Sequence, residues 1–181
     1  LPEETDEKSE AYKAGYKTIP EISRERIRRA GDKIASEHPD AKVDYGFRAL
    51  KIDSLNEIGK VELGEIQQTE LLNYVDNFHD DRNAYDLLYG YLIHAGMPLN
   101  GAFELKQTGE QDVMFYDYLG EGTGVVACLE MSVSDAAVQV IAEAQPLVAV
   151  FRDGAFQTSQ EKINVVQKIK AISPETQVKV L

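Results

Sequence analysis

Apolar side chains recur at helical spacing between positions 18 and 38, in the run TIPEISRERIRRAGDKIASEH. This spacing predicts an amphipathic helix. Thr18 and Glu21 have the spacing of a capping box, and Pro20 suits the first turn. The stripe that we expect this helix to bury consists of Ile22, Ile27, Ala30 and Ile34. The preceding residues 1–17 are polar and poor in aliphatic side chains, which indicates an extended or loosely ordered lead-in.

A shorter apolar run follows in VDYGFRALKIDS and predicts a strand from about Gly46 to Ile52, with Asp53 and Ser54 at its C-terminal end. Lead-in, helix and strand make up residues 1–54, which are too few to cover both faces of a sheet. We therefore expect this part to be an incomplete piece of a doubly wound α/β fold. Residues 55–68, LNEIGKVELGEIQQ, are polar with spaced glycines and are typical of a linker.

The remaining residues, 69–181, carry the patterns of a second unit. TELLNYVDNF and NAYDLLYGYLIHAGMP both show apolar residues at helical spacing, and Gly96 and Pro98 mark the end of the second helix. The stripes predicted for the core are Leu71, Leu72, Val75 and Phe78 in the first helix, and Ala84, Leu87, Leu88, Tyr91, Leu92 and Ala95 in the second.

Strand and helix patterns alternate over the rest of this unit. DVMFYDYL and GVVACLEM are β-rich runs, SDAAVQVIAEA is a helix that Ser134 caps, PLVAVF is a buried strand, SQEKINVVQKIKAI is a helix and QVKVL is a final strand. The strand–helix–strand order from Leu147 to Leu181 predicts a right-handed parallel crossover. The predicted fold class is α/β: a partial doubly wound helix–strand piece, followed by a small α/β domain with a β-hairpin and a βαβ crossover.

The glycine cluster Gly120-Glu121-Gly122-Thr123-Gly124 has the G-x-G-x-G form of loops that bind S-adenosylmethionine or a dinucleotide. Such a loop is followed directly by a helix, whose free N–H groups face the ligand. Here Gly124 is followed by the β-branched run VVACL, which favours a strand. The glycines therefore predict the turn of a β-hairpin.

The charge of the chain, −12 in total, is unevenly distributed. Residues 1–60 carry 12 lysines and arginines against 13 acidic residues, whereas residues 61–181 carry 7 against 18. The second part would repel a polyanion such as DNA, so any nucleic-acid contact of this chain has to come from the arginines of RERIRR. The alternative for these arginines is a solvated, salt-bridged helix face.

The cysteine content and the length of the apolar runs indicate the cellular compartment of the protein. The single cysteine, Cys128, lies in an apolar run and cannot form an internal disulfide, which agrees with a reducing cytoplasm. No apolar run is long enough for a membrane span, and the acidic start differs from a signal peptide.

Two polar clusters each have a chemical and a structural interpretation. The first, DNFHDDR, holds Asp76, His79, Asp80 and Asp81. It could bind a metal ion, but it has no second ligand pair at suitable spacing, and a helix end followed by a cap at Asp80 or Asp81 explains it too, so we predict no metal site. In the second, Asp153 follows a buried strand, where open α/β sheets carry their sites, and Lys162 and Asn164 can join it. An Asp-Gly turn is the alternative for Asp153.

Four stretches together resemble one family of proteins: GYKTIPEISRERIRRAGDKI, DYGFRALKIDSLN, LLYGYLIHAGMPL, and the run from VFRDGAF through KINVVQKIK to VKVL. They are similar to the C-terminal part of the modification subunits of type III restriction–modification systems. These subunits are adenine-N6-specific DNA methyltransferases that use S-adenosylmethionine. The resemblance extends from Leu1 to Leu181 and is most specific at 16–34 and 44–54.

The resemblance implies a role for each part of the chain. Residues 1–54 would be the tail end of a methyltransferase-like cofactor-binding core, and 69–181 a C-terminal α/β interaction domain for dimerisation and subunit contact. In this fold a polar residue after the third strand reaches the adenine of the cofactor, which implies Asp53. The ribose contact follows the second strand, which makes Glu3 a second candidate. The implied partners are a restriction subunit and a second copy in a homodimer.

The catalytic elements of such enzymes are missing from the chain. Its six prolines include no adjacent pair, so the D/N-P-P-Y/F element that holds a flipped base is absent, and its one glycine cluster is the predicted hairpin. We therefore expect no catalytic residue here, and DNA and S-adenosylmethionine binding only through other regions of a parent protein. Because the first residue is Leu1 and not Met, we expect a piece of a longer chain that is inactive alone.

Two other functions stay open at this point. The acidic charge of residues 67–181 and the tyrosines of the helix NAYDLLYGYLIHAGMP suit a free-standing, non-catalytic protein-interaction module. A small-ligand enzyme that uses Asp153 and Lys162 is the other.

Overall fold

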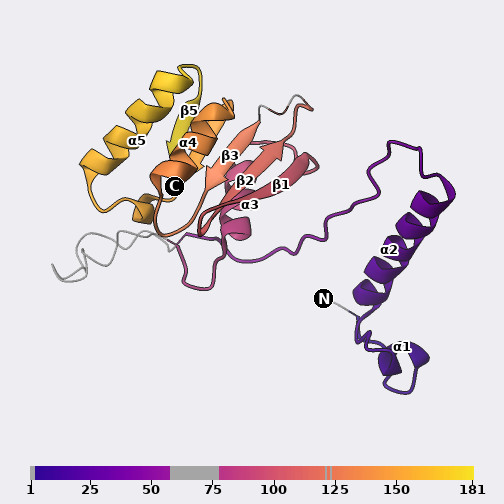
Figure 1. Ribbon diagram of the computed structural model, residues 1–181. Helices are drawn as coiled ribbons and strands as arrows, with labels where there is room; N and C mark the ends of the chain where they lie inside the picture. Colours follow the sequence, from indigo (N-terminus) through magenta and orange to yellow (C-terminus); the bar gives the residue numbers. More distant parts are fainter. Residues whose placement is uncertain (1–2, 58–77, 121, 123) are drawn as a thin grey trace, which may run out of the picture. The chain divides into compact units, whose positions relative to one another are not determined.

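The computed structural model describes residues 3–57, 78–120, 122 and 124–181, and the chain divides into two compact units, Leu1–Asp53 and Ser54–Leu181. The first unit holds two helices, α1 (Glu10–Lys13) and α2 (Ile19–Glu37) (Figure 1). The short helix α1 lies inside the predicted loosely ordered lead-in. Its N-cap is Ser9, whose Oγ accepts the N–H of Tyr12 at 3.1 Å. The lead-in is therefore more regular than its composition indicates.

The predicted helix is confirmed in α2, including its capping box. The carboxylate of Glu21 accepts the backbone N–H groups of Lys17 at 2.7 Å and of Thr18 at 3.0 Å. The prediction of a buried stripe is wrong, because none of the described residues of α2 is buried, and Ile27 and Ile34 are 50% and 45% exposed. Helical spacing gives a helix an apolar face, but only a neighbouring element can cover that face.

The strand predicted from about Gly46 to Ile52 is absent. Residues 41–55 have no regular secondary structure, and Leu50 and Ile52 are 59% and 98% exposed. A strand needs a hydrogen-bonded neighbour, and none of the described residues pairs with this segment. The expected doubly wound piece thus shows its helix without its strand, and its methyltransferase-like character stays a prediction.

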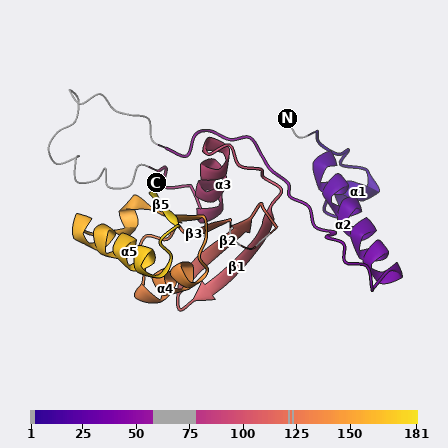
Figure 2. The same ribbon diagram turned by 90° about the horizontal axis from the view of Figure 1, so that it is seen from above.

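The second unit is a mixed five-stranded sheet with helices on both faces (Figures 1 and 2). Along the sheet the strands follow the order β1-β2-β3-β4-β5. β2 pairs antiparallel with both β1 and β3, whereas β4 pairs parallel with both β3 and β5. The elements are α3 (Ala84–His94), β1 (Ala102–Thr108), β2 (Gln111–Asp117), β3 (Val125–Cys128), α4 (Asp135–Glu143), β4 (Val148–Phe151), the 3-10 helix η2 (Asp153–Ala155), α5 (Ser159–Ile172) and β5 (Gln177–Val180).

Most predicted elements of this unit are confirmed. The β-hairpin is the antiparallel pair β2–β3, in which Met114 lies opposite Ala127, and the crossover is the parallel pair β4–β5 with α5 between them. Ser134 caps α4 as predicted. The sequence interpretation missed β1 and the second parallel crossover, β3–α4–β4. The helix predicted in TELLNYVDNF lies outside the described residues, apart from Phe78.

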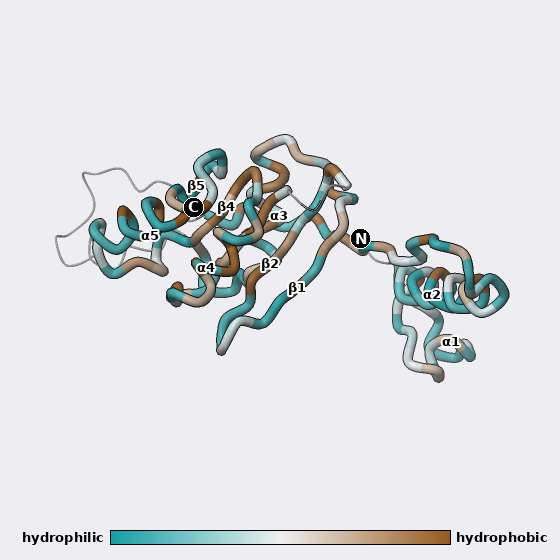
Figure 3. Tube along the Cα trace, turned by 45° about the horizontal axis from the view of Figure 1, so that its top comes forward, coloured by the Kyte–Doolittle hydropathy of each residue, from teal (hydrophilic) through white to brown (hydrophobic). Residues whose placement is uncertain are grey.

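Two apolar clusters lie on opposite faces of this sheet. Alternate residues of each strand point to opposite faces of the sheet, so both faces carry apolar side chains. Helix α3 covers the cluster on one face, and α4 and α5 cover the cluster on the other (Figure 2). The apolar strands in the middle of the sheet and the more polar β1 at its edge are distinct in Figure 3. The α3 side buries Leu87, Leu88, Leu92, Met114, Tyr116, Val125, Ala127, Val148 and Val150, and the other side buries Val113, Val126, Cys128, Ala137, Val138, Ile141, Ala142, Ala149, Phe151 and Ile169.

Candidate functional site

The glycine-rich bend between β2 and β3 is organised by a carboxylate at the end of β2. Asp117 Oδ1 accepts the backbone N–H groups of Leu119 at 3.0 Å and Gly120 at 2.9 Å, and its Oδ2 accepts that of Gly122 at 2.6 Å. Gly120 and Gly122 have φ angles of +79° and +73°, which other residues rarely adopt. In an anion-binding loop such N–H groups face the ligand, but here the chain's own carboxylate accepts them. The bend is the predicted hairpin turn.

Asp153 and Lys162 come together at the end of β4, as the sequence indicates. Asp153 begins the 3-10 helix that follows β4, its backbone N–H donates to the Leu181 carbonyl at 2.9 Å, and its carboxylate forms an ion pair with the Lys162 ammonium. Asn164 does not join this pair, because its Oδ1 accepts from Gln160 Nε2 at 2.9 Å. Both charged side chains are partly exposed. The pair attaches the start of α5 to the strand before it.

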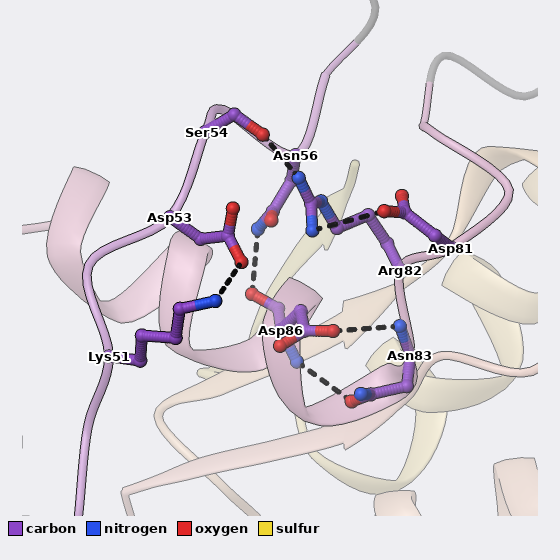
Figure 4. A network of polar contacts seen from close by, with 8 residues as sticks. All are labelled: Lys51, Asp53, Ser54, Asn56, Asp81, Arg82, Asn83 and Asp86. Carbon is purple, nitrogen blue, oxygen red and sulfur yellow. Dashed lines mark hydrogen bonds and ion pairs between the residues drawn. The ribbon is translucent and has the colours of Figure 1, made fainter. Parts of the chain in front are cut away.

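The two candidate cofactor residues lie in separate parts of the first unit. Glu3 precedes α1, and its backbone carbonyl accepts the N–H of Ile19 at 2.8 Å. Asp53 lies near the end of the irregular segment after α2, where its Oδ2 lies 3.7 Å from Lys51 Nζ (Figure 4). Both are exposed at the surface. A contact of either residue with S-adenosylmethionine remains a prediction.

Two of the arginines on α2 are paired within the helix. Glu25 accepts from Arg28 Nη1 at 2.6 Å and from Arg29 Nε at 2.7 Å. The hydrogen bonds with Arg29 and Arg28 hold the pKa of the Glu25 carboxyl below its usual range, and the bond with Glu25 raises the pKa of Arg29. For these two side chains the salt-bridged alternative is confirmed.

A surface hollow of about 460 Å³ lies beside α2. Arg24 and Arg28 line it together with Tyr45 and Phe47, which come from the irregular segment. Gly31 has no side chain at this point, and a Cβ there would lie 3.4 Å from Tyr45. The segment therefore folds back onto the helix without forming a strand.

The sequence interpretation missed a polar network around the start of α3 (Figure 4). Asn56 Nδ2 donates to the Asp86 carbonyl at 2.7 Å, and the Asn56 carbonyl accepts the N–H of His79 at 3.1 Å. Arg82 Nη2 donates to Ser54 Oγ, and Arg82 lies 3.7 Å from Asp81. This network ties residues 54–57 to α3. The bond from Asn56 to Asp86 joins residues 30 positions apart, so local sequence patterns carry no signal for it.

The cap of α3 differs from the one expected. Asp80 and Asp81 form a turn before the helix, and Asn83 is the N-cap, with Oδ1 accepting from Tyr85 at 2.9 Å and Asp86 at 3.1 Å. Asp76 lies outside the described residues. Within 3–57, 78–120, 122 and 124–181, no three His, Cys, Asp or Glu side chains gather as metal ligands would, and no helix has the length and apolar character needed to cross a bilayer.

Comparison with known proteins relates the chain to one modification subunit. No protein-family model matches it. It is 33% identical over 115 residues, or 64% of its length, to the Mod subunit of the type III restriction-modification enzyme StyLTI of Salmonella typhimurium strain LT2. The match covers 14% of that Mod subunit, so the chain spans a small part of its relative's length. These figures support a relation between this chain and a type III Mod subunit.

Proposed function

We propose, from this relation, that the chain is part of a site-specific DNA methyltransferase, the modification subunit of a type III restriction–modification system. The parent would transfer a methyl group from S-adenosylmethionine to adenine N6 in DNA in the cytoplasm. The observation that carries the proposal is the 33% identity over 115 residues to a Mod subunit. The four stretches that resemble this family support it.

Within the parent, we assign the chain to subunit contact rather than to chemistry. The sheet unit has its own core on both faces, and Asp117 occupies the N–H groups of its glycine bend. The carboxylate of Asp153, which follows β4, is neutralised by its ion pair with Lys162. DNA and the restriction subunit would bind the parent protein. A second copy of this chain would bind the chain itself, in a homodimer.

The proposal is tested by measuring cofactor binding and methyl transfer for the 181-residue chain and for the complete protein. Calorimetry should detect no S-adenosylmethionine binding to the 181-residue chain. The protein expressed from the complete reading frame should bind the cofactor and transfer labelled methyl groups to adenine in double-stranded DNA. A complete protein without methyl transfer, or cofactor binding by the 181 residues alone, would contradict the proposal.

The cofactor candidates can be separated by substitution in the complete protein. Asp53→Ala should weaken S-adenosylmethionine binding about tenfold, because one hydrogen bond to the adenine is lost, and Glu3→Ala should weaken it less. Asp40→Ala is the matched control, since Asp40 is also an exposed carboxylate that follows α2. Equal effects of Asp53→Ala and Asp40→Ala would remove Asp53 from the cofactor site.

The alternative is a free-standing, non-catalytic protein-interaction module. Its support is the acidic sheet unit, whose helix α3 exposes Tyr85. A reading frame that ends within a few residues of this chain, together with binding to a protein partner in light scattering, would favour this alternative.

A further inference from the structure

The strand β1 forms one edge of the sheet. Among the described residues β2 alone pairs with β1, and five of its seven residues are exposed. Figures 1 and 3 show it along the outer side of the sheet unit. An edge strand presents a row of N–H and C=O groups to which a further strand can bind.

The side chains of β1 divide between the two faces of the sheet. Phe103 and Leu105 lie opposite Tyr116 and Met114 and so point to the α3 side, and Leu105 is 41% exposed. Glu104 and Lys106 point to the other side, where Lys106 Nζ lies 4.2 Å from the ring centre of Phe115 and 3.6 Å from Glu104 Oε2. Both charged side chains of β1, one of each sign, therefore lie on one face, and the other face is uncharged.

We propose that β1 is a homodimer interface, at which the edge of one chain pairs antiparallel with β1 of a second copy. The two-fold axis would pass through Leu105, the middle residue of Ala102–Thr108. Glu104 then lies opposite Lys106 of the second copy, and Lys106 opposite its Glu104. The two Leu105 side chains meet at the centre, and the two sheets join into one.

This register is favoured over its neighbours by charge and by length. An axis through Glu104 places two glutamates opposite each other, and an axis through Lys106 places two lysines together, both of which are unfavourable. An axis between two residues would bring side chains of different faces opposite each other. Only the register centred on Leu105 pairs all seven residues and also matches opposite charges.

The charge of the rest of the chain also favours pairing of two copies at β1. The net charge is −12, so most of the surface repels a second copy. β1 carries one positive and one negative side chain, and it is therefore neutral within an acidic unit. At the other edge of the sheet, β5 has four residues, of which Lys179 alone is charged, so no register of β5 with itself pairs opposite charges.

The inference rests on the proposed subunit-contact role and names its surface, yet its test is independent of methyl transfer. Light scattering and sedimentation equilibrium of the 181-residue chain should show a dimer. Lys106→Glu and Glu104→Lys should each weaken the dimer about tenfold or more, because both cross-strand pairs then carry like charges. Lys179→Glu, which changes the net charge as Lys106→Glu does but at the opposite edge, should leave the dissociation constant unchanged.

Exchanging the charges of Glu104 and Lys106 distinguishes a loss of strand pairing between two copies from a loss of folding. The double variant Glu104→Lys with Lys106→Glu should regain the dimer, and an equimolar mixture of the two single variants should form a heterodimer. Circular dichroism checks that each variant is folded. A monomeric chain, a dimer that none of these changes affects, or a double variant that stays as weak as the single ones would overturn the interface. None of these outcomes would bear on methyl transfer by the complete protein.

Discussion

At the scale of single residues, Asp117 has the most specific role. Asp117→Ala removes three hydrogen bonds to backbone N–H groups of the bend, so the free energy of unfolding should fall by about 1–3 kcal/mol. Asp117→Asn keeps an acceptor and should have a smaller effect. Glu110→Ala, at an exposed turn position, should change stability by less than about 0.5 kcal/mol. Urea denaturation measures all three, and equal values for Asp117→Ala and Glu110→Ala would contradict the role of Asp117.

The buried thiol of Cys128 should make the stability of the protein depend on pH in the alkaline range. Burial raises the pKa of its thiol to about 11, whereas the thiol of the unfolded chain titrates near 8.5. A raised pKa in the folded state gives stability that is complete below the unfolded pKa and is lost as the pH rises toward the folded pKa. Between pH 9 and 10 the free energy of unfolding should therefore fall by about 1 kcal/mol more in the wild type than in Cys128→Ala. Parallel pH dependences in the two proteins would show that the thiol does not contribute.

Residue identities at the candidate sites were only partly predictable. Asp153 and Lys162 could be placed together, because one follows a strand and the other lies in the helix that comes next. The role of Asp117 could not, since it depends on the path of the five residues after it. Asn56 depends on a partner 30 positions away.

At the scale of elements, α3 and residues 54–57 are coupled through Gly90. A Cβ on Gly90 would overlap the Nδ2 of Asn56, which bonds the Asp86 carbonyl. Gly→Ala inside a helix normally stabilises by about 1 kcal/mol, but here Gly90→Ala should destabilise, because it displaces Asn56. In the Asn56→Ala background the same change should become stabilising. A double-mutant cycle by urea denaturation measures this coupling, and a Gly90→Ala effect of the same sign in both backgrounds would exclude it.

Two of the errors at this scale, the missed β1 and the strand predicted over residues 46–52, have one cause. Phe103 and Leu105 alternate with Glu104 and Lys106, which is strand periodicity, and Gly101 and Gly109 flank this run, yet the sequence interpretation missed β1. Residues 46–52 have strand-like composition and form no strand. Both outcomes depend on whether a neighbouring strand is present, and periodicity alone does not report a neighbour.

At the scale of the whole molecule, the two units should contribute unequally to stability. Ile141 in α4 is fully buried, whereas Ile27 in α2 is 50% exposed. Ile141→Ala should therefore cost about 2–5 kcal/mol, and Ile27→Ala less than about 0.5 kcal/mol beyond its helix propensity. Thermal or urea unfolding compares this matched pair. A large cost of Ile27→Ala would show that the apolar face of α2 is covered in solution.

The sequence by itself determined the features that depend on near neighbours along the chain. These are the capped helices α2 and α4, the hairpin bend at the glycines, and the strand–helix–strand order that ends at Val180, because caps, turns and β-branched runs act over a few residues. Tertiary structure decided which faces are covered, which strand lies at the edge, and whether residues 46–52 pair. These outcomes depend on partners distant in the chain, and a backbone hydrogen bond or an apolar contact forms only where such a partner is brought into reach.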